Sequence, residues 1–228
     1  MSMLDLHIRF SHLPTDVEFV RFSNLANTLG FTGLALETPK ALKLPALHCP
    51  LTIFRRLTLS PRGATRLRFR VQKQMPQADL LVIHGRSKPI WLAAAEIPSV
   101  HMIMLKDIED FMVMDSRVAR VTANHNKPVE LCLQNLLTLK GSIRSRLMRV
   151  MNNAVKHLVR ADCPLILTSG ASQLCELRAP RDLEALSFLA AVPEDLAKEA
   201  MRQKPLALIS QIQDARQNIH GVDFGRET

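Results

Sequence analysis

Aromatic residues are scarce in this sequence. It contains no tyrosine, one tryptophan and nine phenylalanines, so aromatic side chains make up only 4% of its 228 residues. Proteins that hold single-stranded nucleic acids normally stack the bases on exposed aromatic side chains. This composition therefore argues against a protein built as a base-stacking platform.

Long apolar runs and a leader-like N-terminus are also missing. No apolar run approaches the roughly 20 residues that a membrane span needs, so no membrane partner is expected. No basic stretch precedes an apolar one at the N-terminus, so a secretory signal is not expected either. The four cysteines, at positions 49, 132, 163 and 175, form no Cys-x-x-Cys pair. We therefore expect buried free thiols in a reducing cytoplasm.

The sequence lacks the common motifs for binding nucleotides and for hydrolysis by a serine nucleophile. It has no Gly-x-Gly-x-x-Gly and no Gly-Lys-Ser/Thr loop, which cradle phosphates in many enzymes. Ser169 stands in Ser-Gly-Ala, outside the Gly-x-Ser-x-Gly frame of a nucleophile elbow. These two classes of enzyme are therefore not supported.

Acidic residues are absent from two long segments. Residues 38–78 hold nine Lys or Arg and no acid, and residues 131–161 hold six Lys or Arg and no acid. The net charge is +9, so these segments carry +15 and the rest of the chain carries −6. Such segregation favours a phosphate-rich partner, because the guanidinium group binds phosphate well. Solvated basic faces without nucleic acid are the alternative.

Strand-like and helix-like segments alternate along the chain. Strands are expected at residues 3–9, 32–37, 51–59, 78–83, 100–105, 129–133 and 165–167. Helices are expected at residues 16–29, 64–74, 87–96, 115–125, 142–160, 181–190, 193–202 and 204–216, with Asp16 and Ser87 as N-caps. A proline-rich loop is expected at 38–50.

The alternation predicts an α/β fold, with a parallel sheet and crossover helices. At this length a TIM-barrel-like (β/α) barrel of about seven parallel strands is favoured over an open doubly wound sheet. We see no internal repeat and no low-complexity linker. The prediction is one domain over residues 1–228, with a flexible tail at 218–228.

A buried strand, a turn and a helix start follow one another at residues 165–182. Pro180 suits the first helical position, and Asp182 falls in the first turn, where the helix dipole favours a carboxylate. Arg178 and Arg181 flank this start, so free N–H groups and two guanidinium groups would form an anion site. Alternatively, Asp182 caps the helix and both arginines pair with nearby carboxylates.

Other basic residues and a methionine-rich segment follow strand-like runs. Arg86 and Lys88 come after one strand, and Arg55 and Arg56 lie on another, so we expect all four to contact phosphates. The methionines between residues 102 and 114 are expected to pack in the core or at an interface. A scaffold that binds only protein through this segment is a further possibility.

Possible metal ligands are few and scattered. Asp5, His7, His84 and His101 fall on or near the ends of expected strands. The Asp-Leu-His start is similar to the PHP phosphoesterases, which carry a His-x-His pair on the first strand. Arg9 stands at the second position of that pair. We therefore expect no catalytic residue and no metal ligand.

The order and spacing of several motifs resemble RNase P protein component three over nearly the whole chain. The most specific pieces are Thr168-Ser-Gly-Ala171 and Leu177-Arg-Ala-Pro-Arg-Asp182, which resemble the family's Ser-Ser/Gly-Ala turn and its Leu/Ile-Arg-x-Pro-x-Asp motif. Ala78-Asp-Leu-Leu-Val-Ile-His-Gly85 resembles its Asp-Val-Leu-x-Val-His-Gly segment, and 26–36 its passage from helix to strand. Residues 101–116 depart from it, because they lack a Ser/Asn-His-Pro-like turn.

The resemblance implies a barrel related to the PHP phosphoesterase fold and a role in which RNA carries out the chemistry. The protein would be an RNA-binding subunit of ribonuclease P, supporting a catalytic RNA that removes the 5′ leader of precursor tRNA. The isolated polypeptide would be inactive and would hold no cofactor, while the RNA would need Mg. Its partners would be the RNase P RNA, precursor tRNA, the ferredoxin-like protein component two and other protein subunits.

The RNA-binding role and its rival each depend on particular residues. The RNA-binding residues would be Arg55, Arg56, Arg86, Lys88, Arg178 and Arg181. The rival is a PHP-like metal-dependent phosphoesterase that uses His7, His84 and His101.

Overall fold

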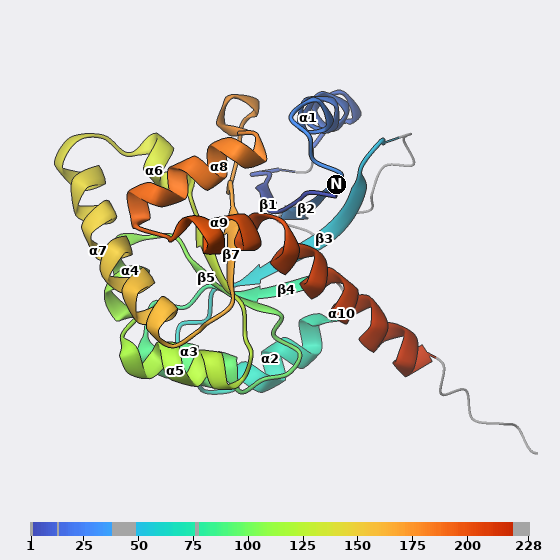
Figure 1. Cartoon of the computed structure of the whole chain (residues 1–228). Coiled ribbons are helices and arrows are strands. Elements are labelled where there is room, and N and C mark those ends of the chain that lie inside the picture. The colour runs from blue at the N-terminus through green and yellow to red at the C-terminus, as the bar shows by residue number, and fades with distance from the viewer. Residues whose placement is uncertain (1, 13, 38–48, 76–77, 221–228) are drawn as a thin grey trace, which may run out of the picture.

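Seven parallel strands form a nearly closed barrel in a computed structural model that describes residues 2–12, 14–37, 49–75 and 78–220 (Figure 1). The strands are β1 (Leu4–Arg9), β2 (Gly33–Glu37), β3 (Thr52–Leu59), β4 (Leu80–Ile83), β5 (Met102–Leu105), β6 (Val129–Cys132) and β7 (Leu165–Thr168). They pair in sequence order, and each neighbouring pair is parallel. The expected barrel of about seven parallel strands is confirmed.

The ring closes where β1 meets the segment after β7. Ile8 and Ala171 form a parallel bridge, and the Arg9 N–H donates to the Ala171 carbonyl at 2.9 Å. Gly170, directly before Ala171, suits this turn, because its φ is +64° and a Cβ there would overlap the Cys132 Sγ on β6.

Helices surround the strands (Figure 1). They are α1 (Asp16–Thr28), α2 (Leu67–Gln74), α3 (Lys88–Ala95), α4 (Ile108–Val113), α5 (Ser116–Asn124), α6 (Gln134–Thr138), α7 (Gly141–Arg160), α8 (Pro180–Ser187), α9 (Glu194–Met201) and α10 (Gln203–His220), with 3-10 helices η2 (Leu174–Glu176) and η3 (Phe188–Ala190). The short helices α4 and α6 were not predicted. Within the described ranges, no helix has the length and apolar character to cross a bilayer.

Two apolar layers follow from the alternation of side chains along the strands. Residues such as Leu81 and Ile103 face outward and pack under the helices. Leu80 and Met102 face inward, where Leu208 and other apolar residues of α10 pack against them. All four residues of β4 are buried, as its continuous apolar sequence predicts.

The N-caps of two helices differ from expectation. Thr15, not Asp16, caps α1: its Oγ1 accepts the Glu18 N–H at 3.3 Å, and the Glu18 carboxylate accepts the Thr15 N–H at 2.8 Å. This is the Ser/Thr-x-x-Glu capping box, which the sequence Thr-Asp-Val-Glu contains. Ser87 occupies the N-cap position of α3 but makes no capping hydrogen bond.

Two expectations fall wholly or partly outside the described residues. The predicted tail begins at residue 218, yet α10 continues to His220, so the first three residues of that tail are helical. Residues 221–228 lie outside the described ranges, as do residues 38–48 of the predicted proline-rich loop. Cys132 and Cys163 are buried free thiols, as expected, whereas Cys49 is half-buried and Cys175 is exposed.

Candidate functional site

A network of buried charged side chains fills part of the barrel interior. The Glu130 carboxylate on β6 lies at its centre, and its Oε2 accepts from Arg56 Nη2 on β3 at 2.7 Å. Its Oε1 lies 2.8 Å from His7 Nδ1 on β1 and accepts from the Thr168 hydroxyl at 2.6 Å. Glu37, at the end of β2, lies 3.4 Å from both His7 Nε2 and Arg56 Nε.

Except for Glu37, which is 23% exposed, the network is enclosed, and its charges hold one another ionised. Burial alone would raise the pKa of Glu130, but the Arg56 and His7 charges and hydrogen bonds outweigh it and hold that pKa at about 2. Burial and the Arg56 charge would lower the pKa of His7, but Glu130 raises it to about 10. The imidazole is therefore cationic at neutral pH, and two cations face two carboxylates.

Arg56 is accordingly a structural residue, and its predicted contact with RNA is wrong. Its side chain is 0% exposed, and its guanidinium also donates to the Leu6 carbonyl at 2.7 Å. No surface is left from which this group could touch a phosphate. The sequence does contain a signal for this arrangement, namely charged residues (His7, Glu37 and Glu130) inside strand segments of a predicted barrel.

Asp5 is a second buried carboxyl on β1, beside the turn after β7. Its Oδ1 accepts the His7 N–H at 3.1 Å and the Ser169 N–H at 3.3 Å, while its Oδ2 has no partner among the described residues. Burial raises the pKa of Asp5 to about 6, against the opposing hydrogen bonds. The carboxyl thus joins the two ends of the barrel ring.

The three histidines proposed as metal ligands do not converge. His7 is in the interior network, His84 follows the carboxyl end of β4, and His101 precedes the amino end of β5. In a parallel barrel the last two lie at opposite ends. The His101 Nδ1 instead accepts the Leu81 N–H at 2.9 Å.

A different group at the carboxyl ends of β4 and β5 has the composition of a metal site. His84, Asp107 and Asp110 each place one potential ligand atom within 4.8 Å of the others. However, the Asp110 Oδ2 already accepts from His84 Nε2 at 2.8 Å and from the backbone N–H groups of Lys106 and Asp107 at 3.0 and 2.8 Å. The bond from the Asp107 N–H is part of a capping box between Asp107 and Asp110 at the start of α4. The cluster therefore has a structural role in closing that loop.

Arg86 and Lys88 lie at the surface near this cluster and are paired with acids. Arg86 Nη2 donates to Asp107 at 3.1 Å, and Lys88 Nζ donates to Asp115 at 2.6 Å. Their side chains are 66% and 53% exposed, so both remain accessible to a partner. An RNA phosphate would have to share them with these carboxylates.

Arg55 lies at the other end of the barrel. It forms a two-point pair with Asp79, with Nη2 to Oδ1 at 2.9 Å and Nε to Oδ2 at 3.1 Å. Arg216 on α10 donates to the same carboxylate at 2.8 Å. Asp79 precedes β4, so this group fastens α10 to the amino end of the barrel, away from Arg86 and Lys88.

The start of α8 has the local structure on which the predicted anion site depends. Pro180 occupies the first turn and Asp182 follows it, as expected. Arg178 Nη1 donates to the carbonyls of Cys175 and Leu177, both at 2.7 Å. Arg181 is exposed, and within the described ranges neither arginine pairs with a carboxylate.

The methionines of the 101–116 segment are divided between core and surface. Met102, Met104 and Met114 are buried, with exposures of 0%, 3% and 2%, whereas Met112 is 59% exposed. The segment forms β5 and α4, so most of its apolar content serves the barrel itself.

Fold and site define a TIM-barrel-like protein with an ion-pair network inside and a strongly basic exterior. The family model for RNase P subunit p30 matches residues 2–217, and the chain belongs to this family. It is 26% identical to ribonuclease P protein component 3 of Methanosarcina mazei over 90% of this chain and 85% of that one. It is 29% identical to the same component of Methanosarcina barkeri over 83% and 82% of the two chains.

Solved structures show the same fold. A chain in a cryo-EM structure of archaeal ribonuclease P with mature tRNA aligns with a TM-score of 0.74 at 20% identity, over 98% of this chain and 97% of that one. A crystallised amidohydrolase aligns with a TM-score of 0.60 at 13% identity, over 93% and 75% of the two chains. The barrel is thus shared with proteins of other activities, and the fold alone does not fix function.

Proposed function

We propose that this chain is a non-catalytic, RNA-binding subunit of a ribonuclease P whose RNA cleaves the 5′ leader from precursor tRNA. Membership of the RNase P subunit p30 family over residues 2–217 supports the assembly. The divalent cations of the reaction would be held by the RNA, and the cytoplasm is the proposed place of action.

The observation that carries the non-catalytic role is the position of Arg56. Its guanidinium lies between Glu37 and Glu130, the two carboxylates that face the interior beside His7. A metal-dependent phosphoesterase needs such carboxylates and imidazoles free to bind cations and a water. Here a fixed organic cation already neutralises them, so the interior provides structure rather than a catalytic metal centre.

The partners follow from the same proposal. RNase P RNA and precursor tRNA would bind the basic exterior, through contacts to phosphates that position RNA without reading its sequence. The ferredoxin-like protein component two and other protein subunits would complete the assembly. Arg86, Lys88, Arg178 and Arg181 remain accessible for such contacts, and Arg55 would contribute only if it left Asp79.

Cleavage of precursor tRNA tests the proposal. The purified chain alone should release no 5′ leader at any Mg²⁺ concentration, whereas the ribonucleoprotein isolated from its own cells should release it. Removing this chain from a reconstituted particle should lower the rate, and adding it back should restore the rate. Leader cleavage by the purified chain, abolished by a chelator, would contradict the non-catalytic role.

Among the described residues, the cluster of His84, Asp107 and Asp110 favours a metal-dependent phosphoesterase, because its donor atoms suit a cation. Against it, Asp110 Oδ2 already accepts from two backbone N–H groups and Asp107 Oδ2 from Arg86, although Asp110 Oδ1 has no partner among the described residues. Metal content of the chain purified without chelator, together with hydrolysis of a simple phosphate ester, distinguishes the two functions.

A further inference from the structure

The helix α2 and the loop before it carry a dense set of exposed cations. Arg62, Arg66, Arg68, Arg70 and Lys73 lie within twelve residues and all are exposed. Within the described ranges, none of the five forms an ion pair, in contrast to Arg55, Arg86 and Lys88. We call these five residues, together with Phe69, the α2 basic surface.

Most of α2 faces solvent because few of its residues are apolar. Leu67 and Val71, one turn apart, are buried against the barrel with exposures of 1% and 0%. Phe69 lies off that face and is 65% exposed, between Arg68 and Arg70 in the sequence. An exposed ring flanked by cations is available to a partner, because aromatic side chains contribute strongly to interfaces.

A pocket adjoins these side chains. It has a volume of about 440 Å³ and lies between the end of β3 with its following loop, at Ser60 and Pro61, and the helix face that carries Phe69, Arg70 and Lys73. Those three side chains lie within about one turn of the helix, on its side facing the loop. The pocket thus has cations and an aromatic ring on one wall.

The backbone before α2 is held in an unusual conformation. Arg66 has a φ of +60°, in the left-handed region that non-glycine residues rarely occupy, and it stands at the N-cap of the helix. Such strain costs on the order of a kilocalorie per mole and often marks functional segments. The left-handed residue lies where the loop that carries Arg62 passes into the helix.

We propose that the α2 basic surface is an RNA-binding site of this chain, in which Arg66, Arg70 and Lys73 hold backbone phosphates and Phe69 stacks on an unpaired base. This inference rests on the proposed function, which it makes more specific. RNA is favoured over an acidic protein because arginine binds phosphate in two-point contacts and an exposed ring can stack on any base.

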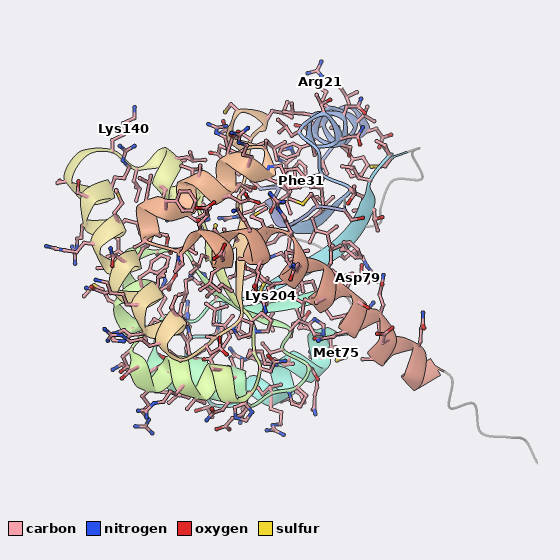
Figure 2. The ribbon with its side chains drawn as sticks, in the orientation of Figure 1. Arg21, Phe31, Met75, Asp79, Lys140 and Lys204 are labelled. Atoms are coloured by element: carbon pink, nitrogen blue, oxygen red, sulfur yellow. The ribbon has the colours of Figure 1, made fainter. Side chains whose placement is uncertain are left out.

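This site is separate from the predicted anion site at α8. Figure 1 shows α8 at the top of the molecule and α2 at the bottom, on opposite sides of the barrel. Figure 2 places Met75, at the end of α2, likewise far from Lys140, which precedes α7. The exposed cations of α7 therefore provide a control surface with the same type of charge.

The test measures binding of a fluorescent RNA hairpin, with a stem of about ten base pairs and a loop of unpaired nucleotides, to the full chain at several KCl concentrations. Arg70→Gln/Lys73→Gln should lower the slope of log Kd against log salt by about 1.5, because each phosphate that is no longer neutralised lowers it by roughly 0.7 to 0.9. Arg149→Gln/Lys156→Gln on α7 removes the same charge outside the proposed site and should lower the slope less than the α2 double variant does.

Phe69→Ala separates stacking from charge. It should weaken binding roughly 5- to 100-fold with an unchanged salt slope, since a stacked base contributes without releasing counterions. Phe69 is largely exposed, so its removal leaves no cavity in the core. Circular dichroism and a thermal melt confirm that each variant is folded.

Three results would overturn the assignment. They are equal weakening of RNA binding by the α2 and α7 double variants, no binding of the hairpin by the unmodified chain, or tighter binding of polyglutamate than of RNA. Precursor tRNA cleavage by the assembled particle is measured in parallel. If the α2 variants bind RNA like the unmodified chain while the particle still cleaves precursor tRNA, only this site is refuted. If the particle cleaves precursor tRNA equally well without this chain, the proposed function is refuted.

Discussion

Replacing Arg56 by methionine is the most direct perturbation of the barrel interior. Methionine resembles the aliphatic part of arginine but carries no charge, so the substitution leaves Glu130 buried beside His7 and without its second cation. Glu37 likewise loses an ion pair at 3.4 Å. Removing one partner of a buried pair leaves an uncompensated charge, which costs about 3–5 kcal/mol.

The pKa of Glu130 leads to a similar magnitude. A carboxyl whose pKa falls from 4.5 to about 2 on folding stabilises the folded state above pH 4.5. Since each tenfold change in proton affinity corresponds to about 1.4 kcal/mol, this contribution is about 3 kcal/mol at neutral pH, and it disappears as the pH falls from 4.5 towards 2. The uncompensated charge and the lowered pKa of Glu130 both lead us to expect a large decrease in the stability of Arg56→Met.

Urea unfolding followed by circular dichroism measures this decrease. The free energy of unfolding of Arg56→Met should fall by about 3–5 kcal/mol at pH 7.5, and the difference from the parent should narrow below pH 4.5. Arg56→Met/Glu130→Met removes both charges and should recover much of the stability. A decrease below about 1 kcal/mol in Arg56→Met, with no dependence on pH, would refute the network.

Three further predictions concern other parts of the molecule. Gly170→Ala should lower the free energy of unfolding by about 2–3 kcal/mol in a denaturant titration, because φ is +64° and the new Cβ would overlap Cys132 Sγ; an unchanged midpoint would contradict this. The folded chain holds a proton on Asp5 up to about pH 6, so the stability from this group is complete below pH 3.8 and disappears as the pH rises through 6. The Tm of Asp5→Asn should therefore exceed that of the parent by more at pH 7.5 than at pH 4. The same difference at both pH values would show that Asp5 has an ordinary pKa. Arg178→Ala/Arg181→Ala should lower the salt slope of RNA binding by roughly one for each phosphate that these arginines neutralise, and a folded double variant with an unchanged slope would remove both residues from the RNA-binding set.

The architecture was predictable because its signals are local. Buried strands such as β4 read as continuous apolar runs, and α7 repeats its apolar residues at helical spacing over 20 residues. The missed helices α4 and α6 have only six and five residues, too few for a period to appear. The capping box from Thr15 to Glu18 was present in the sequence and indicates the correct start of α1.

The site was less predictable because it depends on pairs distant in the sequence. Arg55 and Arg56 are adjacent, yet alternation along β3 sends Arg56 inward to Glu130, 74 residues away, and Arg55 to Asp79 on the outside. Charge density alone predicted that both contact RNA. The cations that remain unpaired within the described part of α2 are identified only once the positions of the acids around them are known.

Pull-down of the tagged chain from its own cells, followed by sequencing of the co-purifying RNA, tests the central claim most directly. We expect enrichment of one structured RNA, together with a small ferredoxin-like protein, in a particle that cleaves the 5′ leader of precursor tRNA. A chain that enriches no RNA and instead carries bound zinc or manganese with phosphatase activity would contradict it.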